Sequence, residues 1–527
     1  MHKDWFEDDN EIRLLHRGKR RLLDIVFGRT MVITLLLVLQ IAIMVLGAHY
    51  LGRYYPALTI VLRVMSVAVI IYLVNKSGSA TTKITWIILV MALPAFGVLL
   101  YLFVQLDIGH RYANRRVQES ILSTVQYVPR QTELMARLRT ELPEVHNLAE
   151  YTLRSGDYPV YENTAVTYYP MGQDKIGALI EALQSAEHFI FLEYFIIEEG
   201  DVWGRILKIL EERVRAGVEV RVLYDGTCTF YRLPYGYPKR MEALGIRCKM
   251  FAPLRPLVST YYNNRDHRKI MVIDGQIAFT GGVNLADEYI NKIVRFGYWK
   301  DSGVRLDGPG AASLANIFLT FWKAKYPDED LDAGCDLPAA VPVETDCLVQ
   351  PFADTPVDRE AVAKNVYLEL INQAQKRLYI CTPYLILDND LLSCLRLAAK
   401  RGVDVRIYTP GVPDKPTIYQ LTRSYFPHLL RAGVKIYSYT PGFLHAKTWL
   451  VDDRIAAVGT VNLDYRSLYL HFENACWFCG CSAVADVRRD FDALFPVCRE
   501  VTQEYADTRS LAVRGWDCVL RLFSPLM

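Results

Sequence analysis

The last two thirds of the chain contain two copies of one pattern, and this internal repeat constrains the fold more than any other feature. The segment "LQSAEHFIFLEYFII" (183–197) resembles "INQAQKRLYICTPYLIL" (371–387). Each copy alternates short apolar, β-rich runs with helical stretches. We therefore expect two tandem α/β units with largely parallel sheets, related by a pseudo-two-fold axis, at 161–340 and 341–510.

Each copy also contains the motif H-x-K-x-x-x-x-D, in "NRDHRKIMVIDG" (264–275) and in "FLHAKTWLVDD" (443–453). An asparagine follows each motif lysine at a distance of 15 residues. The motif residues, which are the candidate catalytic residues, are His267, Lys269, Asp274, His445, Lys447 and Asp452. The two asparagines are Asn284 and Asn462. Two such matches in register with a repeat indicate one composite site.

The spacing within the motif predicts which side chains act together. On a strand, residues i and i+2 share a face. Each histidine should therefore point the same way as its lysine. Asp274 and Asp452 lie seven residues after their histidines, an odd offset. Although they belong to the motif, their side chains should point elsewhere, which favours a structural role over a catalytic one.

Two histidines, two lysines and two asparagines that converge form an anion site suited to a phosphodiester. Lysine and amide donors can hold the non-bridging oxygens and stabilise the charge of the transition state. One neutral imidazole can attack phosphorus, and the other can donate a proton to the leaving alkoxide. We expect no metal, because Lys269 and Lys447 supply the positive charge and no carboxylate cluster is apparent.

A histidine used in this way needs a carboxylate behind it to fix its tautomer. Glu473 lies 28 residues after His445, and Asp301 occupies the comparable place after His267, at the head of a similar strand. We therefore expect Glu473 to orient His445 and Asp301 to orient His267. The alternative is that both acids are exposed charges at strand ends.

The duplicated motif with its following glycine and asparagine resembles the signature of the phospholipase D superfamily, over roughly residues 160–510. Within that range, "GTVNLDYRSLYLHFEN" and "RFGYWKDSGVRLDGPG" are similar to bacterial cardiolipin synthases, as is the terminal "RLFSPLM". Three positions depart from the pattern. Gly282 and Thr460 stand where serine is common, and His471 stands where asparagine is usual.

The resemblance implies a phosphatidyl transfer between two phosphatidylglycerol molecules that yields cardiolipin and glycerol. It implies His267 as the nucleophile, His445 as the acid and base, and no cofactor. A hydrolase that uses water, or a transferase that uses phosphatidylethanolamine, keeps the same fold. A nuclease is disfavoured by a net charge of only +2, which predicts no nucleic-acid partner. A non-enzymatic scaffold would have no use for two complete motifs.

The first 105 residues hold most of the apolar excess of the chain. Uncharged runs cover 31–47 and 84–104, and a third run, 58–74, is interrupted by Arg63. A spanning helix needs about 20 mostly apolar residues. The sequence therefore predicts a transmembrane region at 31–105 with two to three spans, in an integral protein of the cell membrane.

The remaining segments complete the predicted organisation. Residues 1–30 are a basic segment, 106–160 a helical connector, and 511–527 an amphipathic tail that lies on the bilayer or packs on the second unit. Eleven cysteines without framework spacing are typical of a reducing compartment, which favours a cytoplasmic catalytic region. Membrane lipids are the expected partners, and both a monomer and a homo-oligomer stay open.

Overall fold

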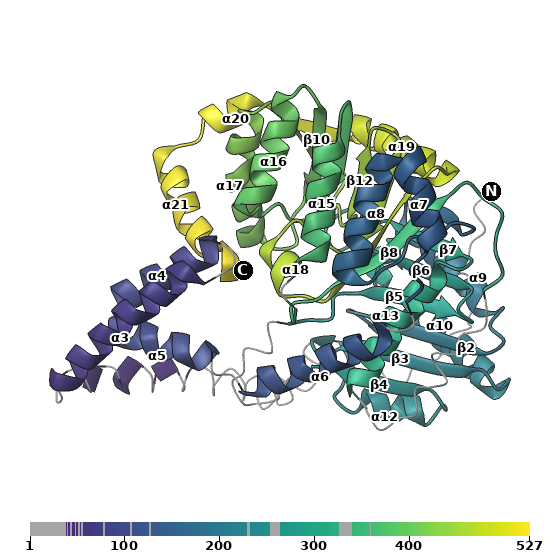
Figure 1. Ribbon diagram of the computed structural model, residues 1–527, viewed down its shortest axis with the longest axis horizontal. Helices are drawn as coiled ribbons and strands as arrows, with labels where there is room; N and C mark the ends of the chain where they lie inside the picture. The colour runs from purple at the N-terminus through teal and green to yellow at the C-terminus, as the bar shows by residue number, and fades with distance from the viewer. Residues whose placement is uncertain are drawn as a thin grey trace.

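The computed structural model describes residues 56–76, 80–105, 108–125, 128–228, 232–252, 264–325, 340–358 and 360–526, with single residues between 38 and 53. Two β-sheets form the body of the molecule, one from each predicted unit (Figure 1). The predicted pair of tandem α/β units is therefore present.

The first sheet has seven strands in the order β1-β7-β6-β5-β2-β3-β4. The strands are β1 (Ala165–Tyr169), β2 (Phe189–Tyr194), β3 (Glu219–Asp225), β4 (Arg247–Phe251), β5 (Lys269–Ile273), β6 (Ile277–Gly281) and β7 (Gly303–Asp307). Only the pairs β2–β3 and β3–β4 are parallel. The prediction of a largely parallel sheet is therefore wrong, because β5 pairs antiparallel with β2, β6 with β5 and β7 with β6. A short turn joins β5 to β6, whereas the longer segment 282–302 leads from β6 to β7.

The second sheet repeats this topology and adds one strand at its edge, in the order β15-β11-β10-β9-β12-β13-β14-β8. Its strands are β8 (Leu348–Asp354), β9 (Arg377–Cys381), β10 (Asp404–Pro410), β11 (Lys435–Tyr439), β12 (Thr448–Val451), β13 (Ile455–Gly459), β14 (Glu473–Cys479) and β15 (Cys498–Val501). Read from β8, the order matches that of the first sheet strand for strand. The sequence repeat is thus a repeat of topology.

Helices cover the outer face of each sheet and also fill the space between the sheets (Figure 1). The outer helices of the first sheet are α9 (Gly172–Leu183), α10 (Asp201–Arg215) and α12 (Tyr237–Glu242). Those of the second are α15 (Val362–Gln373), α16 (Asn389–Lys400) and α17 (Pro416–Leu430). Between the sheets lie α13 (Ala311–Lys325) and α19 (Ser482–Leu494), which contact strands of both.

The alternation of side chains along each strand divides the core between these layers. On β2, Phe189 and Phe191 face the inner layer, where they meet residues of the second sheet, α13 and α19. Ile190 and Leu192 face α9 and α10 on the outer side. Strands that are buried on both faces therefore read as continuous apolar runs, as "FIFLEY" does.

The predicted connector 106–160 is helical, but much of it belongs to the body of the molecule. Helix α6 (Ile108–Val125) packs along α13, and Ser120 Oγ donates to the carbonyl of Thr320 at 2.7 Å. Helices α7 (Thr132–Glu141) and α8 (Pro143–Gly156) pack on the second sheet. Their apolar side chains form one core cluster with α15 and β8.

Helices α3 (Pro56–Asn75), α4 (Ala80–Ala92) and α5 (Pro94–Gln105) stand apart from the two-sheet body (Figure 1). The run 84–104, predicted as one span, is divided between α4 and α5, because Pro94 has no amide hydrogen to continue the helix. Among the described residues, no helix combines the length and apolar character that a membrane crossing needs. The basic segment 1–30 and most of the run 31–47 lie outside the described residues.

The predicted amphipathic tail forms α21 (Leu511–Leu522), which follows α20 (Gln503–Asp507) and packs on α17. Asp517 is buried on this side and accepts a hydrogen bond from Gln420 at 2.9 Å. The opposite side exposes Trp516 and Val519. Thr85 of α4 donates to the carbonyl of Leu522 at 2.8 Å, so the chain end meets the N-terminal helices. The tail therefore uses one side for the second unit and leaves the other uncovered.

Candidate active site

Two short backbone bridges join the units beside the motif histidines. Asp266, just before His267, pairs in parallel with Phe472, just before Glu473. Lys300, just before Asp301, pairs in the same way with Leu444, just before His445. The amide of His267 donates to the carbonyl of Phe472 at 2.9 Å, and that of His445 to the carbonyl of Lys300 at 2.7 Å. Each histidine is thereby placed beside a carboxylate of the other unit.

The histidine–carboxylate pairs consequently cross between the units. His267 Nδ1 lies 2.8 Å from Glu473 Oε2, and His445 Nδ1 lies 2.6 Å from Asp301 Oδ2. The expectation that each carboxylate orients the histidine of its own unit is wrong. Offsets within one unit carry no information about the register between units, and that register makes the pairing. Because a carboxylate accepts, Nδ1 carries the proton of each neutral ring and Nε2 keeps its lone pair.

Burial keeps both histidines neutral. Burial lowers the pKa of His445 to about 4, with Lys447 acting in the same direction and Asp301 opposing it. Burial also lowers the pKa of His267 well below its usual value, although Glu473 opposes the shift. The pKa of the Glu473 carboxyl is itself held low, because its contact with His267 outweighs the effect of burial. At neutral pH each site half therefore holds a neutral imidazole against an ionised carboxylate.

The motif lysines lie beside their histidines, as the i and i+2 spacing predicts. Lys447 Nζ donates to the carbonyl of His445 at 2.6 Å and lies 3.0 Å from Nε2 of its ring. Lys269 Nζ donates to the carbonyl of His267. Both lysine side chains are fully buried. Burial lowers the pKa of Lys269 to about 7 and that of Lys447 to about 8.

Both histidines and both predicted asparagines line one cavity of about 330 Å³. Asn284 is held from both ends, because its Oδ1 accepts from the amide of Ile196 at 3.0 Å and its Nδ2 donates to the Tyr289 hydroxyl at 2.7 Å. Asn462 Oδ1 is buried with no hydrogen-bond partner among the described residues. Lys269 and Lys447 are not part of the cavity lining and lie behind the histidines.

The rest of the cavity wall was not singled out by sequence as part of the site. It is aromatic and charged, and includes Phe195, Arg295, Phe296, Trp299, Tyr384, Lys415, Phe443 and Arg466. Arg232 also reaches the wall, where it pairs with Glu288 at 3.0 Å. The segment "RFGYW" (295–299) could have indicated this part of the wall, because its basic and aromatic residues directly precede Asp301 in the sequence.

Asp274 and Asp452 anchor the backbone, which agrees with the structural role that their odd offset from the histidines favours. Asp274 accepts three amide hydrogens, from residues 187–189 at 2.7–2.8 Å. Asp452 accepts the equivalent three, from residues 375–377 at 2.7–2.8 Å. Each carboxylate thus ties the end of its motif strand to the start of the adjacent strand. Neither residue lines the cavity.

The departures from serine at positions 282 and 460 give Asp301 and Glu473 different surroundings. Thr460 Oγ1 donates to Glu473 Oε2, the oxygen that also contacts His267. At Gly282, a Cβ atom would lie only 2.0 Å from Asp301 Oδ1. A side chain at position 282 would displace the carboxylate that orients His445. The missing hydroxyl in the first unit therefore makes room for Asp301.

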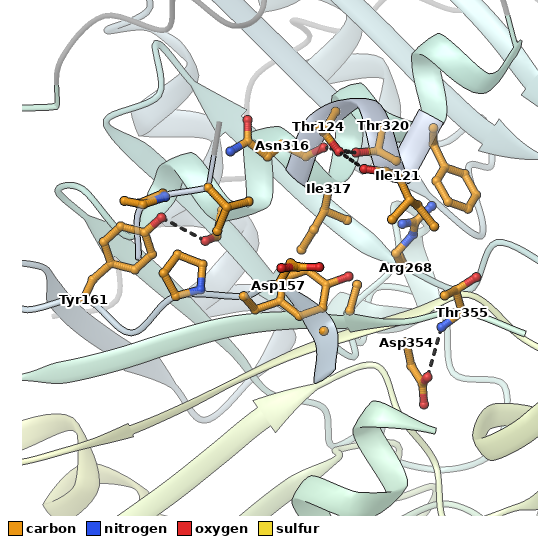
Figure 2. A pocket seen from close by; sticks show the side chains of 18 residues that line it. Ile121, Thr124, Asp157, Tyr161, Arg268, Asn316, Ile317, Thr320, Asp354 and Thr355 are labelled. Carbon is orange, nitrogen blue, oxygen red and sulfur yellow. Dashed lines mark hydrogen bonds between the residues drawn. The ribbon is translucent and has the colours of Figure 1, made fainter. Parts of the chain in front are cut away.

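A smaller cavity lies on the opposite face of the motif strand, between the two sheets (Figure 2). Its volume is about 60 Å³, and Arg268 points into it from between the motif histidine and lysine. The guanidinium carbon lies 3.5 Å from the centre of the Phe321 ring, and the group pairs with Glu193 at 2.6 Å. These contacts anchor the strand from behind, while His267 lines the larger cavity.

Comparison with known proteins agrees with this geometry. The family described as "Cardiolipin synthase, PLD-like domain" matches residues 179–295 and 367–495, and "Phospholipase D-nuclease N-terminal" matches 64–105. A cardiolipin synthase of Geobacillus kaustophilus is 33% identical over 472 residues, covering 88% of this chain and 92% of that protein. The chain belongs to the cardiolipin synthase family.

Other relatives extend the match. A cardiolipin synthase of Halalkalibacterium halodurans is 32% identical over 95% of this chain and 100% of its own length. An uncharacterized protein of Streptococcus mutans is 45% identical over 87% of this chain and 99% of its own length. The crystal structure of a phosphatidylserine synthase from Haemophilus influenzae has the same fold, with a TM-score of 0.55 over 72% of this chain and 99% of that chain at 16% identity.

The anchoring role of Asp274 gives a first prediction. Asp274→Asn should lower the stability by about 1–3 kcal/mol, because the amide cannot accept three hydrogen bonds with the strength of a carboxylate. The midpoint of thermal unfolding should fall, while turnover at low temperature persists. Asp452→Asn should behave alike. The control is Asp453→Asn, because the Asp453 carboxylate makes only exposed ion pairs among the described residues. This change should lower the stability by less than about 1 kcal/mol. Lost turnover with unchanged unfolding would show a catalytic role instead.

Proposed function

We propose that the protein is a cardiolipin synthase that transfers a phosphatidyl group from one phosphatidylglycerol to a second, with release of glycerol. The observation that carries the proposal is the pair of crossed histidine–carboxylate contacts opening on one cavity. Membership of the cardiolipin synthase family supports the same reaction. A single site with two oriented imidazoles suits a reaction in two steps, in which the same phosphorus is attacked twice.

In the first step, Nε2 of His267 attacks the phosphorus of the donor lipid. The bond from phosphorus to the glycerol oxygen breaks, and protonated His445 gives its Nε2 proton to that oxygen, so that glycerol leaves. The phosphatidyl group stays on His267 as a phosphohistidine. The negative charge of the bound phosphodiester favours the protonated form of His445, which the empty site disfavours.

In the second step, the hydroxyl of another phosphatidylglycerol attacks the phosphohistidine. Neutral His445 now accepts the hydroxyl proton, the bond from phosphorus to nitrogen breaks, and cardiolipin leaves with His267 restored. Lys269 and Lys447 stabilise the charge on the phosphoryl oxygens from behind the rings, and the amide groups of Asn284 and Asn462 act from the cavity wall. We assign His267 as the nucleophile on the resemblance to the family.

We also propose that residues 31–105 hold the protein in the cell membrane as a multi-pass region, with the catalytic units on the cytoplasmic side. Large apolar side chains are exposed along α3 and α4, among them Ile60, Val64, Ile71 and Met91. Trp516 on the uncovered side of α21 adds to this surface near the junction with α4. So extensive an apolar surface is unusual on a protein that faces only water.

The membrane proposal predicts the behaviour of the protein on extraction. The full chain should stay in the membrane pellet after an alkaline carbonate wash, since that treatment removes proteins held only by surface charge. Detergent should release it. Immunoblots of both fractions report the result, with a known peripheral protein as the control. Release by carbonate alone would contradict an integral attachment.

The reaction itself can be tested with purified protein in mixed micelles that contain phosphatidylglycerol as the sole phospholipid. Cardiolipin and free glycerol should appear in equal amounts. Phosphatidic acid as the product would indicate a hydrolase, and no turnover until phosphatidylethanolamine is added would indicate another donor; either result would contradict the proposal. His267→Ala and His445→Ala should each lower the rate by at least about 100-fold. The exposed His188→Ala is the matched control.

The two histidine variants should also differ from each other. With donor lipid labelled in its phosphate, an alkaline quench should preserve the phosphohistidine. His267→Ala should give no labelled protein, because the nucleophile is absent. In His445→Ala the labelled phosphohistidine should still form slowly. It should then persist, since transfer of the phosphatidyl group to the acceptor lacks its base. The reverse pattern would exchange the two roles.

The lysine pKa values predict the pH dependence. A lysine with a pKa near 7 or 8 is charged below that pH and loses its proton as the pH rises through it. Because the empty site needs this charge to bind a phosphodiester, kcat/KM should fall above about pH 7–8. It should not fall toward pH 5, since His267 remains neutral there and a lower pH favours the protonated His445 that the first step needs. Bound lipid keeps the lysines charged, so kcat should change less. Lys269→Arg should move the start of the alkaline fall upward, because Lys269 has the lower pKa of the two lysines. A constant kcat/KM to pH 9 would contradict the prediction.

A further inference from the structure

Glu473 lies between two histidines on the first-unit side of the cavity. Its Oε2 contacts His267 Nδ1 at 2.8 Å, and its Oε1 lies 3.5 Å from His471 Nδ1. The two imidazole rings lie 5.5 Å apart, centre to centre. One ligand-type atom from each of the three residues lies within 4.8 Å of the other two. His471 occupies the position where the pattern of bacterial cardiolipin synthases has asparagine, so this third ligand distinguishes the chain from that pattern.

Two atoms of this group have no hydrogen-bond partner among the described residues. They are His471 Nδ1 and Glu473 Oε1, and both are buried. The Glu473 side chain is fully buried, whereas 11% of the His471 side chain is exposed, and His471 lines the cavity together with His267. Unpaired polar atoms in a buried site cost free energy. The pair is thus poised to accept a ligand that enters through the cavity.

We propose that His267, His471 and Glu473 form a binding site for a transition-metal ion of the zinc class, and that the bound ion inhibits the enzyme. Two imidazoles and one carboxylate with space for water are a ligand set that zinc accepts. Ligands of a tetrahedral zinc ion lie roughly 3.4 Å apart. The contacts of 2.8 Å to Glu473 Oε2 and 3.5 Å to Glu473 Oε1 are close to this separation, and one ligand atom of each residue lies within 4.8 Å of the other two.

Inhibition follows from the position of His267 in the site and rests on the proposed function. An ion on Nε2 occupies the lone pair that attacks phosphorus. An ion on Nδ1 replaces the shared proton, separates the ring from its carboxylate and withdraws electron density from Nε2. Lys269, which is buried beside His267, opposes the ion by charge, and this repulsion limits the affinity. A zinc ion at this site therefore acts as a reversible inhibitor and not as a resident cofactor.

Binding is tested directly on the full-length protein in detergent micelles, without any assay of activity. Zn²⁺ is titrated in competition with a chromophoric chelator, and Co²⁺ is followed by its visible absorption bands. The wild-type protein should bind one ion of each. His471→Asn, which restores the amide of the family pattern, should weaken binding at least about 10-fold. His188→Asn, at an exposed site far along the chain, is the matched control and should bind as wild type. Thermal unfolding of each variant checks that it is folded.

The second measurement is the rate of lipid transfer from phosphatidylglycerol at increasing Zn²⁺. Inhibition should be reversed by excess chelator, and His471→Asn should require at least about 10-fold more Zn²⁺ for the same loss. Absence of binding in the wild type, or equal binding in wild type and His471→Asn, overturns the site. Binding without inhibition overturns the inhibitory role. If phosphatidylglycerol yields no cardiolipin, the proposed function fails, and the binding titrations still decide the metal site.

Discussion

Two backbone contacts between the units hold the whole site together. In each, the amide of a motif histidine of one unit donates to the carbonyl of the residue that precedes an acid of the other unit. These bridges are short, but they place Glu473 behind His267 and Asp301 behind His445. Neither unit can assemble an oriented histidine without its partner. The site therefore depends on the interface more than on either sheet.

The charges of the site explain why it is buried so completely. Two carboxylates and two lysines lie within the interface, and each of these groups is fully buried. An isolated buried charge is strongly unfavourable, whereas opposite charges in contact with hydrogen-bond partners are tolerated. Burial lowers the pKa values of the lysines and histidines together. The empty site thus holds its histidines neutral and its lysines near the pH at which they lose their charge, and an anionic ligand favours the charged forms when it enters.

Much of this arrangement could be predicted from the residues. The repeat predicts two equivalent units, and the i and i+2 spacing predicts that His445 and Lys447 share a face. The odd offset of Asp274 predicts that it points away, which its three backbone contacts explain. Patterns within one unit are visible to such reasoning because strand geometry is local.

What could not be predicted arises between segments that are distant in sequence. The exchange of Asp301 and Glu473 between the histidines depends on the register of two bridges, which no spacing within a unit encodes. The mixed direction of the sheets depends on how β5 to β7 return beside β2. The division of the run 84–104 at Pro94, by contrast, follows from the local chemistry of proline, which has no amide hydrogen to continue a helix.

The position of α7 and α8 has a consequence for the order of folding. These helices precede the first unit in the chain, yet their apolar faces complete the core of the second sheet. During synthesis they emerge before β8 and α15, so their partners do not exist until about 200 residues later. The apolar faces of these two helices must therefore stay without their packing partners while the first sheet forms. When the second sheet forms, α7 and α8 pack on it and complete its core. Cutting the protein between its two repeats would therefore leave a second half that lacks part of its own core.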